Sequence, residues 1–218
     1  MSNPGPLRAL KYIHTALERE LELLEADAML ALAGSVSFED LSERFDWTGY
    51  VLDYHAKGED IGVFGTVNDR MPHVATTFED DHRVEETLRE EMTTNLAAFG
   101  EGNASAGEAF ARQCSQLLHT TVRHMNKEEA LLVPLIEANF SMEEQGGMMG
   151  KMMGAFPEDF MAKGIPWVFK RLDSDTRVEY AKALQGAMPP APFSMHMNGV
   201  EQALGASEWA PISEALQA

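Results

Sequence analysis

Four stretches of the chain have apolar residues at alternating three- and four-residue steps, the spacing of one face of an α-helix. The stripes begin near Leu7, Phe38, Phe78 and Phe110. The fourth stripe reads Phe110, Cys114, Leu117, Thr121, His124, Glu128, Leu131 and Leu135. Strand signals, such as alternating β-branched residues between turn dipeptides, are nearly absent. The pattern predicts an all-α protein whose core element is an antiparallel four-helix bundle.

Local signals predict where these helices begin and end. We expect the first helix to end near Gly34, because glycine readily adopts the left-handed geometry that ends helices. Ser37 with Asp40 three residues later resembles a capping box and predicts the start of the second helix. The density of glycine over residues 58–65 predicts that the second helix ends there, before a loop over residues 68–72.

The C-terminal third of the chain differs in composition. Nine of the fourteen methionines follow residue 140, and prolines at positions 157, 166, 189, 190, 192 and 211 predict breaks between short helices. We therefore divide the chain into a bundle over residues 1–140 and an extension over residues 141–218, with three or four short helices packed on the bundle. Because flexible methionine suits adaptable interfaces, this extension is also a candidate homodimer surface.

Charge and cysteine content narrow the classes of function. The 218 residues include 17 Lys and Arg against 35 Asp and Glu, a formal net charge of −18, which disfavours nucleic-acid binding. Cys114 is the single cysteine, so no intrachain disulfide can form. The sequence shows neither an apolar run long enough to span a membrane nor a secretion signal, and we expect a soluble cytoplasmic protein.

The apolar stripes contain residues that a purely structural core does not need. The residues in question are His14, His55, Glu59, His82, His124 and Glu128. Burying a carboxylate without compensation is costly, so each Glu requires a cation, a hydrogen-bond network or a metal. Because residues four apart share one helix face, each His-x-x-x-Glu pair can converge on one ion. Four imidazoles and two bridging carboxylates suit two iron ions, whereas a single zinc needs only four donors.

These six residues form the pattern H-HxxxE-H-HxxxE, which resembles hemerythrin-like (HHE cation-binding) domains over roughly residues 7–140. Pro134, six residues beyond the last Glu, is similar to the proline that usually follows there. The resemblance implies a left-handed bundle around two iron ions with a bridging oxo or hydroxo group, which binds O2, NO or peroxide or senses iron. Residues 140–167 are similar to the segment after such domains in plant iron-sensing ubiquitin ligases, but the ligase's RING cysteines are absent.

The sequence also departs from the oxygen-carrying members of that family. Glu86 stands where they have an extra histidine, which argues against simple reversible O2 carriage, and both Glu86 and Tyr54 are candidates for an additional ligand. We expect a module for O2 or NO binding or sensing, or for iron handling. The alternatives are a di-iron oxidase, ferroxidase or peroxide-consuming enzyme, and a metal-free helical interaction module.

Overall fold

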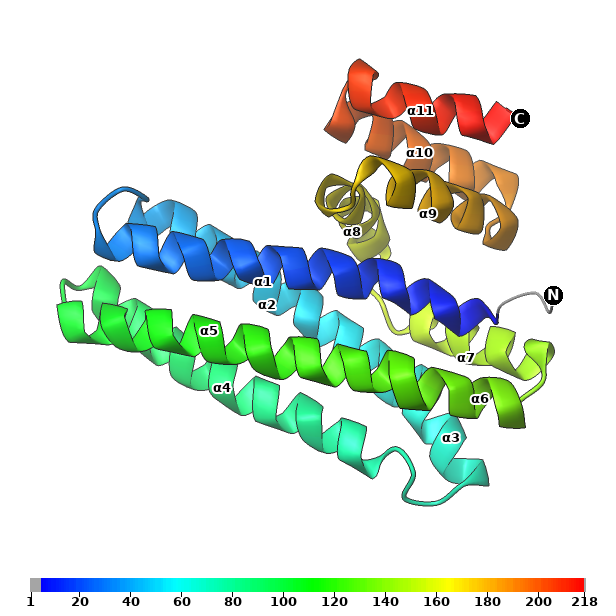
Figure 1. Cartoon of the computed structure of the whole chain (residues 1–218), viewed down its shortest axis with the longest axis horizontal. Helices are drawn as coiled ribbons and strands as arrows, with labels where there is room; N and C mark the ends of the chain where they lie inside the picture. The colour runs from blue at the N-terminus through cyan, green and yellow to red at the C-terminus, as the bar shows by residue number, and fades with distance from the viewer. Residues whose placement is uncertain (1–4, 218) are drawn as a thin grey trace. The chain divides into compact units, whose positions relative to one another are not determined.

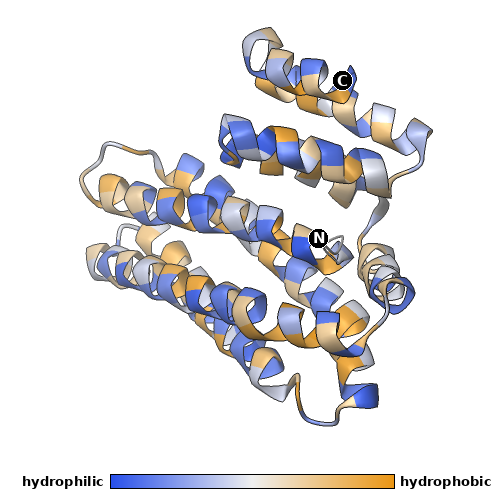
Figure 2. Ribbon diagram, turned by 45° about the vertical axis from the view of Figure 1, so that its right-hand side comes forward, coloured by the Kyte–Doolittle hydropathy of each residue, from blue (hydrophilic) through white to orange (hydrophobic). Residues whose placement is uncertain are grey.

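The computed structural model describes residues 5–217, apart from the side chain of Glu158, and contains no β-strand within that range (Figure 1). Residues 1–4 and 218, at the outer ends of the two predicted segments, lie outside the described residues. The prediction of an all-α fold is therefore confirmed for the described part of the chain. Hydrophobic and hydrophilic residues alternate around the helices (Figure 2), as amphipathic packing requires.

Four long helices make up the framework of the N-terminal part. They are α1 (Leu10–Leu32), α2 (Phe38–Glu59), α4 (Thr76–Gly100) and α5 (Ala104–Lys127), and a 3₁₀ turn, η1 (Pro6–Ala9), precedes α1. Helices α4 and α5 lie side by side and run in opposite directions (Figure 1). Residues 101–103 connect these two helices. Such a short connection is typical of neighbouring helices in an antiparallel bundle.

The described chain forms two compact units. The first contains residues 17–155 together with Gly5 and Pro6, and the second contains residues 7–16 together with residues 156–217. Helix α1 contributes to both units, since the division falls within it.

The predicted helix boundaries at residues 34 and 37 are confirmed. Gly34 has a φ of 74°, and the N–H groups of Gly34 and Ser35 donate to carbonyls in the last turn of α1, the hydrogen-bond pattern of a Schellman motif. The hydroxyl of Ser37 accepts a hydrogen bond from the N–H of Asp40 at 3.0 Å. Phe38, which we placed on the inward stripe, is instead 42 % exposed and packs edge-on against Phe99 at the end of α4.

The prediction that glycines end the second helix is wrong. Helix α2 continues through a π-helical segment, η2 (Asp60–Phe64), into α3 (Gly65–Arg70), so that part of the predicted loop is helical. A Cβ atom on Gly62 would lie 2.7 Å from the carbonyl oxygen of Met148 and 2.7 Å from the amide nitrogen of Met152. Glycine here permits close approach of another helix, α7 (Met142–Gly154), rather than ending α2.

The fourth helix contains a matching irregularity. Helix α5 continues through a π-helical segment, η3 (Glu128–Leu132), into α6 (Val133–Asn139). Leu131, which we expected to point inward, is 61 % exposed, whereas Leu132 and Ile136 are buried. A π turn holds more residues than an α turn, so the inward face moves one position along the chain after Glu128.

The C-terminal residues form more helices than the three or four predicted. The described helices after residue 140 are α7 (Met142–Gly154), α8 (Glu158–Arg171), α9 (Ser174–Ala187), α10 (Pro190–Leu204) and α11 (Ala206–Gln217). Prolines 157 and 189 stand at helix N-caps as expected, but Pro166 and Pro211 lie inside α8 and α11. The predicted breaks at those two prolines are therefore wrong.

Helix α7 belongs to the first unit and α8 to α11 belong to the second. A capping box between Ser141 and Glu144 starts α7, and Arg70 pairs with the same glutamate. The buried methionines Met148 and Met152 pack α7 against η2, so part of the methionine excess serves packing within the unit. In the second unit the core includes Ile165, Phe169, Ala181, Met197, Val200 and Ile212.

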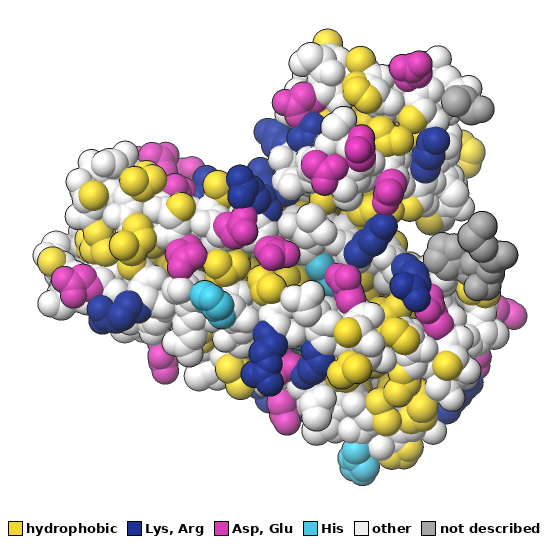
Figure 3. Space-filling view, viewed as in Figure 1, with side chains coloured by type: hydrophobic (Ala, Val, Ile, Leu, Met, Phe, Trp, Pro, Cys, Tyr) yellow, Lys and Arg dark blue, Asp and Glu magenta, His cyan; other side chains and the backbone are white. Residues whose placement is uncertain are grey.

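The surface agrees with the charge balance of the sequence. Acidic side chains are spread over the face shown in Figure 3, with basic side chains between them, and do not gather in one patch. Across residues 5–217, helices that combine the length and the hydropathy needed to cross a membrane are absent.

Candidate metal centre

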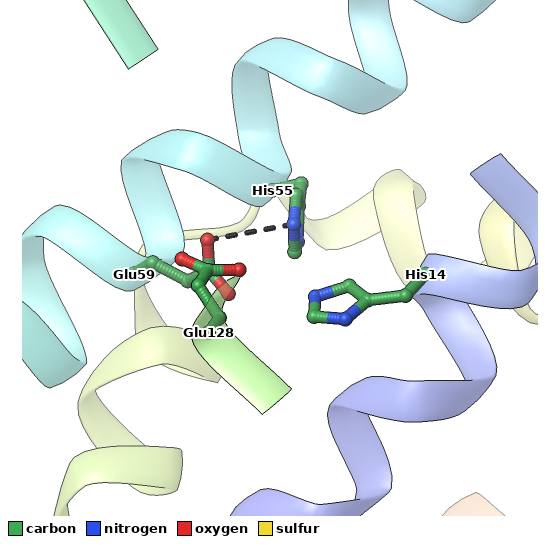
Figure 4. Close-up of side chains that lie close together, drawn as sticks. All are labelled: His14, His55, Glu59 and Glu128. Carbon is green, nitrogen blue, oxygen red and sulfur yellow. Dashed lines mark ion pairs between the residues drawn. The ribbon is translucent and has the colours of Figure 1, made fainter. Parts of the chain in front are cut away.

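The structure brings the six predicted site residues together inside the helical framework. All six side chains are buried, with exposed fractions from 0 % for Glu128 to 8 % for His82. They form two groups, and within each group one ligand atom from every residue lies within 4.8 Å of the others. The groups are His14, His55, Glu59 and Glu128, drawn in Figure 4, and Glu59, His82, His124 and Glu128. Both groups contain Glu59 and Glu128.

The helical register explains this convergence. His55 and Glu59 are one turn apart on α2, and their Nε2 and Oε2 atoms are 3.4 Å apart (Figure 4). The same oxygen of Glu59 is 3.4 Å from Nε2 of His82 on α4. Nε2 of His124 is 3.0 Å from Oε1 of Glu128. Each carboxylate therefore faces at least one imidazole nitrogen of the cluster.

Both glutamates stand at a π-helical segment. Glu59 immediately precedes η2, and Glu128 is the first residue of η3. The N–H of Gly65 donates to the carbonyl of Asp60 and that of Val133 to the carbonyl of Glu128, so each bond spans five residues. Such wide turns in α-helices occur frequently at functional sites. The sequence reasoning missed them, although Pro134 was a usable signal, because its missing N–H and its ring disfavour a regular α-helical turn.

Two further carboxylates fix the orientation of two histidine rings. Nδ1 of His82 is 3.0 Å from Oδ1 of Asp60, and Nδ1 of His124 is 2.9 Å from Oε1 of Glu85. Because a carboxylate only accepts hydrogen bonds, each Nδ1 donates, and Nε2 of each ring is directed to the cluster. Metal-binding histidines commonly have this second partner.

The sequence reasoning did not identify these partners. Asp60 was not singled out, although it directly follows Glu59. Glu85 and Glu86 are adjacent on α4, and the structure distinguishes them: Glu85 is 6 % exposed, whereas Glu86 is exposed. Glu86 belongs to neither candidate metal group. The ring of Tyr54 packs against Tyr50, with centroids 4.9 Å apart.

The electrostatics of the cluster favour positive charge. Burial lowers the pKa of His82, but the hydrogen bond to Asp60 and the nearby carboxylate of Glu59 outweigh burial and raise its pKa to about 9. For His124, burial is outweighed by the hydrogen bonds to Glu128 and Glu85, which raise its pKa to about 11. Positive charge is thus stabilised here, whether an imidazole proton or a metal cation carries it.

The donor set fits a transition-metal cation better than an ordinary buried ion pair. Elsewhere in the first unit the buried carboxylate of Glu20 is matched by the guanidinium of Arg44 at 2.6 Å. Glu59 and Glu128 instead face imidazoles. Nε2 of His82 is buried and accepts or donates no hydrogen bond among the described residues. Imidazole nitrogen with carboxylate oxygen is a suitable donor set for iron.

We expect Glu85→Gln to weaken metal binding about 10- to 100-fold, because the neutral amide no longer supports the His124 ring as a carboxylate does. Iron affinity, measured by competition with a chelator of known strength, checks this prediction. The matched control is Glu91→Gln on the same helix, whose side chain is exposed. Equal affinities for the two variants would show that Glu85 has no such role.

Comparison with known proteins agrees with this geometry. The family model described as the hemerythrin HHE cation binding domain matches residues 5–136. The chain is similar to the zinc finger protein BRUTUS of Arabidopsis thaliana, with 26 % identity over 199 residues. A BRUTUS-like zinc finger protein of the same plant is 23 % identical over 191 residues. The iron-sulfur cluster repair protein YtfE of Musicola paradisiaca is 25 % identical over 133 residues.

The matches cover most of this chain but a smaller share of each relative. The BRUTUS alignment covers 87 % of this chain but 15 % of the plant protein, and the YtfE alignment covers 61 % of this chain and 51 % of its relative. The chain thus corresponds to a small part of the plant proteins. Because the BRUTUS alignment is longer than the family match, the likeness extends into the C-terminal helices. No solved structure matches the chain significantly.

Proposed function

Because the chain belongs to the hemerythrin HHE cation binding domain family, we propose that it holds a non-haem di-iron centre and serves in O2 or NO binding or sensing, or in iron handling. One observation carries the proposal: two groups of four buried ligand residues share Glu59 and Glu128. Two carboxylates common to two donor groups are what a pair of bridged ions requires.

The roles of the residues follow from the two groups. His14 and His55 would be terminal ligands of one ion, and His82 and His124 of the other, with the two glutamates between them. Asp60 and Glu85 hold the rings of His82 and His124 in the orientation that presents Nε2. Bound iron would supply redox chemistry and an open position for a small ligand. The name of the similar repair protein, which refers to iron-sulfur clusters, supports iron over zinc as the metal.

The enzymatic alternative is a di-iron oxidase, ferroxidase or peroxide-consuming enzyme. The same donor set supports it, because an iron ion with an open position can activate oxygen. Turnover of Fe(II) or peroxide well above the rate given by free iron would favour the enzyme. A stable adduct with a small ligand, formed without turnover, would favour binding or sensing.

The remaining proposals concern location and assembly. We propose a soluble cytoplasmic protein without nucleic-acid partners, on the basis of its acidic charge and single cysteine. A homodimer through the Met-rich extension is also proposed. Met142 and Met195 are 48 % and 60 % exposed and are available for such a contact within their own units.

The proposed centre is tested by metal content and an optical spectrum before and after azide is added to the oxidised protein. We expect about two irons per chain and a charge-transfer band that appears with azide, because a di-iron site with an open position binds small anions. Zinc alone, or no iron under any growth condition, would favour the metal-free interaction module.

A further inference from the structure

A pocket of about 580 Å³ lies between α2 and α4 in the first unit. Its wall includes Ala56 from α2, Ile61 from η2, and Glu79 and Glu86 from α4. His82 also lines it, and among the six candidate ligands His82 is the one that does. The pocket therefore extends to one imidazole of the metal cluster.

His82 contacts both the pocket and the buried metal cluster. Its side chain is 7 % exposed, its Nε2 makes no hydrogen bond among the described residues, and that atom is 3.4 Å from Glu59. Its Nδ1 donates to Asp60, whose side chain is 48 % exposed and lines the same pocket. Asp60 and His82 thus provide potential metal-ligand atoms one after the other, from the solvent-accessible pocket to the buried carboxylate of Glu59.

The charges of the pocket suit a cation. Its wall contains four carboxylates, from Asp53, Asp60, Glu79 and Glu86, and three basic side chains, from Lys57, Arg83 and Arg89. Two of the basic groups are engaged in ion pairs: Arg89 pairs with Asp53, and Arg83 with Asp80 and Glu79. The wall thus holds one more carboxylate than basic side chains, and a carboxylate excess raises the local concentration of cations relative to that of anions.

A neighbouring pocket of about 410 Å³ extends the acidic surface along the same two helices. It shares Asp53, Glu86 and Arg89 with the first pocket and adds the carboxylates of Asp46 and Glu90. Arg89 is held at the junction, because its guanidinium also donates to the carbonyl of Gly49 at 3.2 Å. The two pockets together form an acidic groove that leads to His82.

From this arrangement we infer that the groove between α2 and α4 is the entry route for ferrous iron, with Glu86 and Asp60 as successive oxygen donors before His82. The inference rests on the proposed function, since it assigns a path to the same centre. Glu86 lies four residues after His82 on α4, so both side chains are on one helix face. Carboxylate oxygen is a suitable donor for an incoming hydrated divalent ion. On this assignment, Glu86 guides iron and is not a ligand of the final centre.

The test is the rate of iron uptake by the full chain after its metal has been removed by a chelator. The protein is mixed with Fe(II) without oxygen, and unbound Fe(II) is trapped at intervals with a chromogenic chelator. We expect Glu86→Lys to slow uptake about tenfold at low ionic strength and less at high salt, because the effect is electrostatic. The final iron content should equal that of the wild type.

Glu91→Lys is the matched control, because it makes the same charge change at an exposed site on the same helix, outside both pockets. Ala56→Phe is a second variant, which narrows the pocket without changing its charge and should also slow uptake. Glu86→Gln provides a milder change if the lysine variant does not fold.

The outcomes distinguish failure of the proposed entry route from failure of the proposed di-iron centre. Slow uptake in the Glu86 and Ala56 variants, with normal uptake in the Glu91 variant, supports the route. Iron uptake at the wild-type rate in both the Glu86 and Ala56 variants overturns the route and leaves the di-iron proposal standing. A chain that takes up no iron in its wild-type form overturns both. Loss of final iron content in Glu86→Gln would make Glu86 a ligand and overturn its role as a guide.

Discussion

A Glu128→Ala variant is expected to lose most of its iron, falling from about two ions per chain to well below one. Glu128 is fully buried and belongs to both candidate metal groups, so its removal takes an oxygen donor from each ion. It also removes the carboxylate that lies 3.0 Å from Nε2 of His124. Elemental analysis of the purified variant, with iron and zinc counted separately, gives the result directly.

Glu129→Ala is the control for that experiment. Glu129 is the next residue in the same π-helical segment, but it is exposed and belongs to neither group. We expect it to retain the wild-type metal content. Near-stoichiometric iron in Glu128→Ala would count decisively against the assigned centre, provided that the variant has a wild-type circular dichroism spectrum.

Gly62→Val is expected to destabilise the first unit by about 1–3 kcal/mol, the usual cost of forcing extra atoms into a packed interior. The new Cβ would lie 2.7 Å from backbone atoms of both Met148 and Met152, and backbone cannot move aside as a flexible side chain can. Helix α7 must therefore shift away from η2. Denaturant unfolding measures the loss of free energy of unfolding.

The same variant should also bind iron more weakly. Gly62 lies three residues after Glu59 within the π-helical segment, so a displaced η2 changes the direction of that carboxylate. Gly147→Ala, on α7, is the matched control, because its Cβ would meet no atom within 4 Å. Alanine in a helix is favoured over glycine, so this control should be neutral or stabilised by about 0.5–1 kcal/mol. Equal stability for the two variants would show that α7 does not depend on contact with Gly62.

The sequence was sufficient to predict the framework and the clustering of the six site residues. His55 with Glu59 and His124 with Glu128 interrupt apolar stripes at the spacing of one helical turn, and buried carboxylates must be compensated. This reasoning depends on the α-helical period alone. It therefore holds up to each glutamate, where the helices are regular.

Beyond each glutamate the same reasoning fails, for a physical reason. Leu131 is exposed and Leu132 buried because η3 contains a wider turn, and a constant period cannot represent that change. The low helix propensity of glycine predicts a helix end around Gly62, whereas contact with α7 decides the role of this residue. Propensity is a local quantity, and tertiary packing overrides it. Pro166 inside α8 is a further example of this limit.

The hydrogen-bonding partners of His82 and His124 could not be predicted from the sequence, for a different reason. Asp60 and His82 are 22 residues apart and on different elements, and Glu85 and His124 are 39 apart. Helix periodicity places a residue on a face, but the pairing of two faces depends on how the helices are arranged around each other. On a strongly acidic helix, an additional acidic residue carries little information by itself.

The two π-helical segments have a consequence for how this domain is constructed. The segments α2–η2–α3 and α5–η3–α6 repeat one structural plan: a histidine and a glutamate one turn apart, an expanded turn, and a short helix. The first expanded turn contains Gly62 beneath another helix, and the second is followed by Pro134. Glycine accompanies the expanded turn in one segment and proline in the other, so the residues beyond the glutamate differ while the geometry is the same. What the two segments share is a carboxylate one turn after a histidine, placed where the wider turn begins.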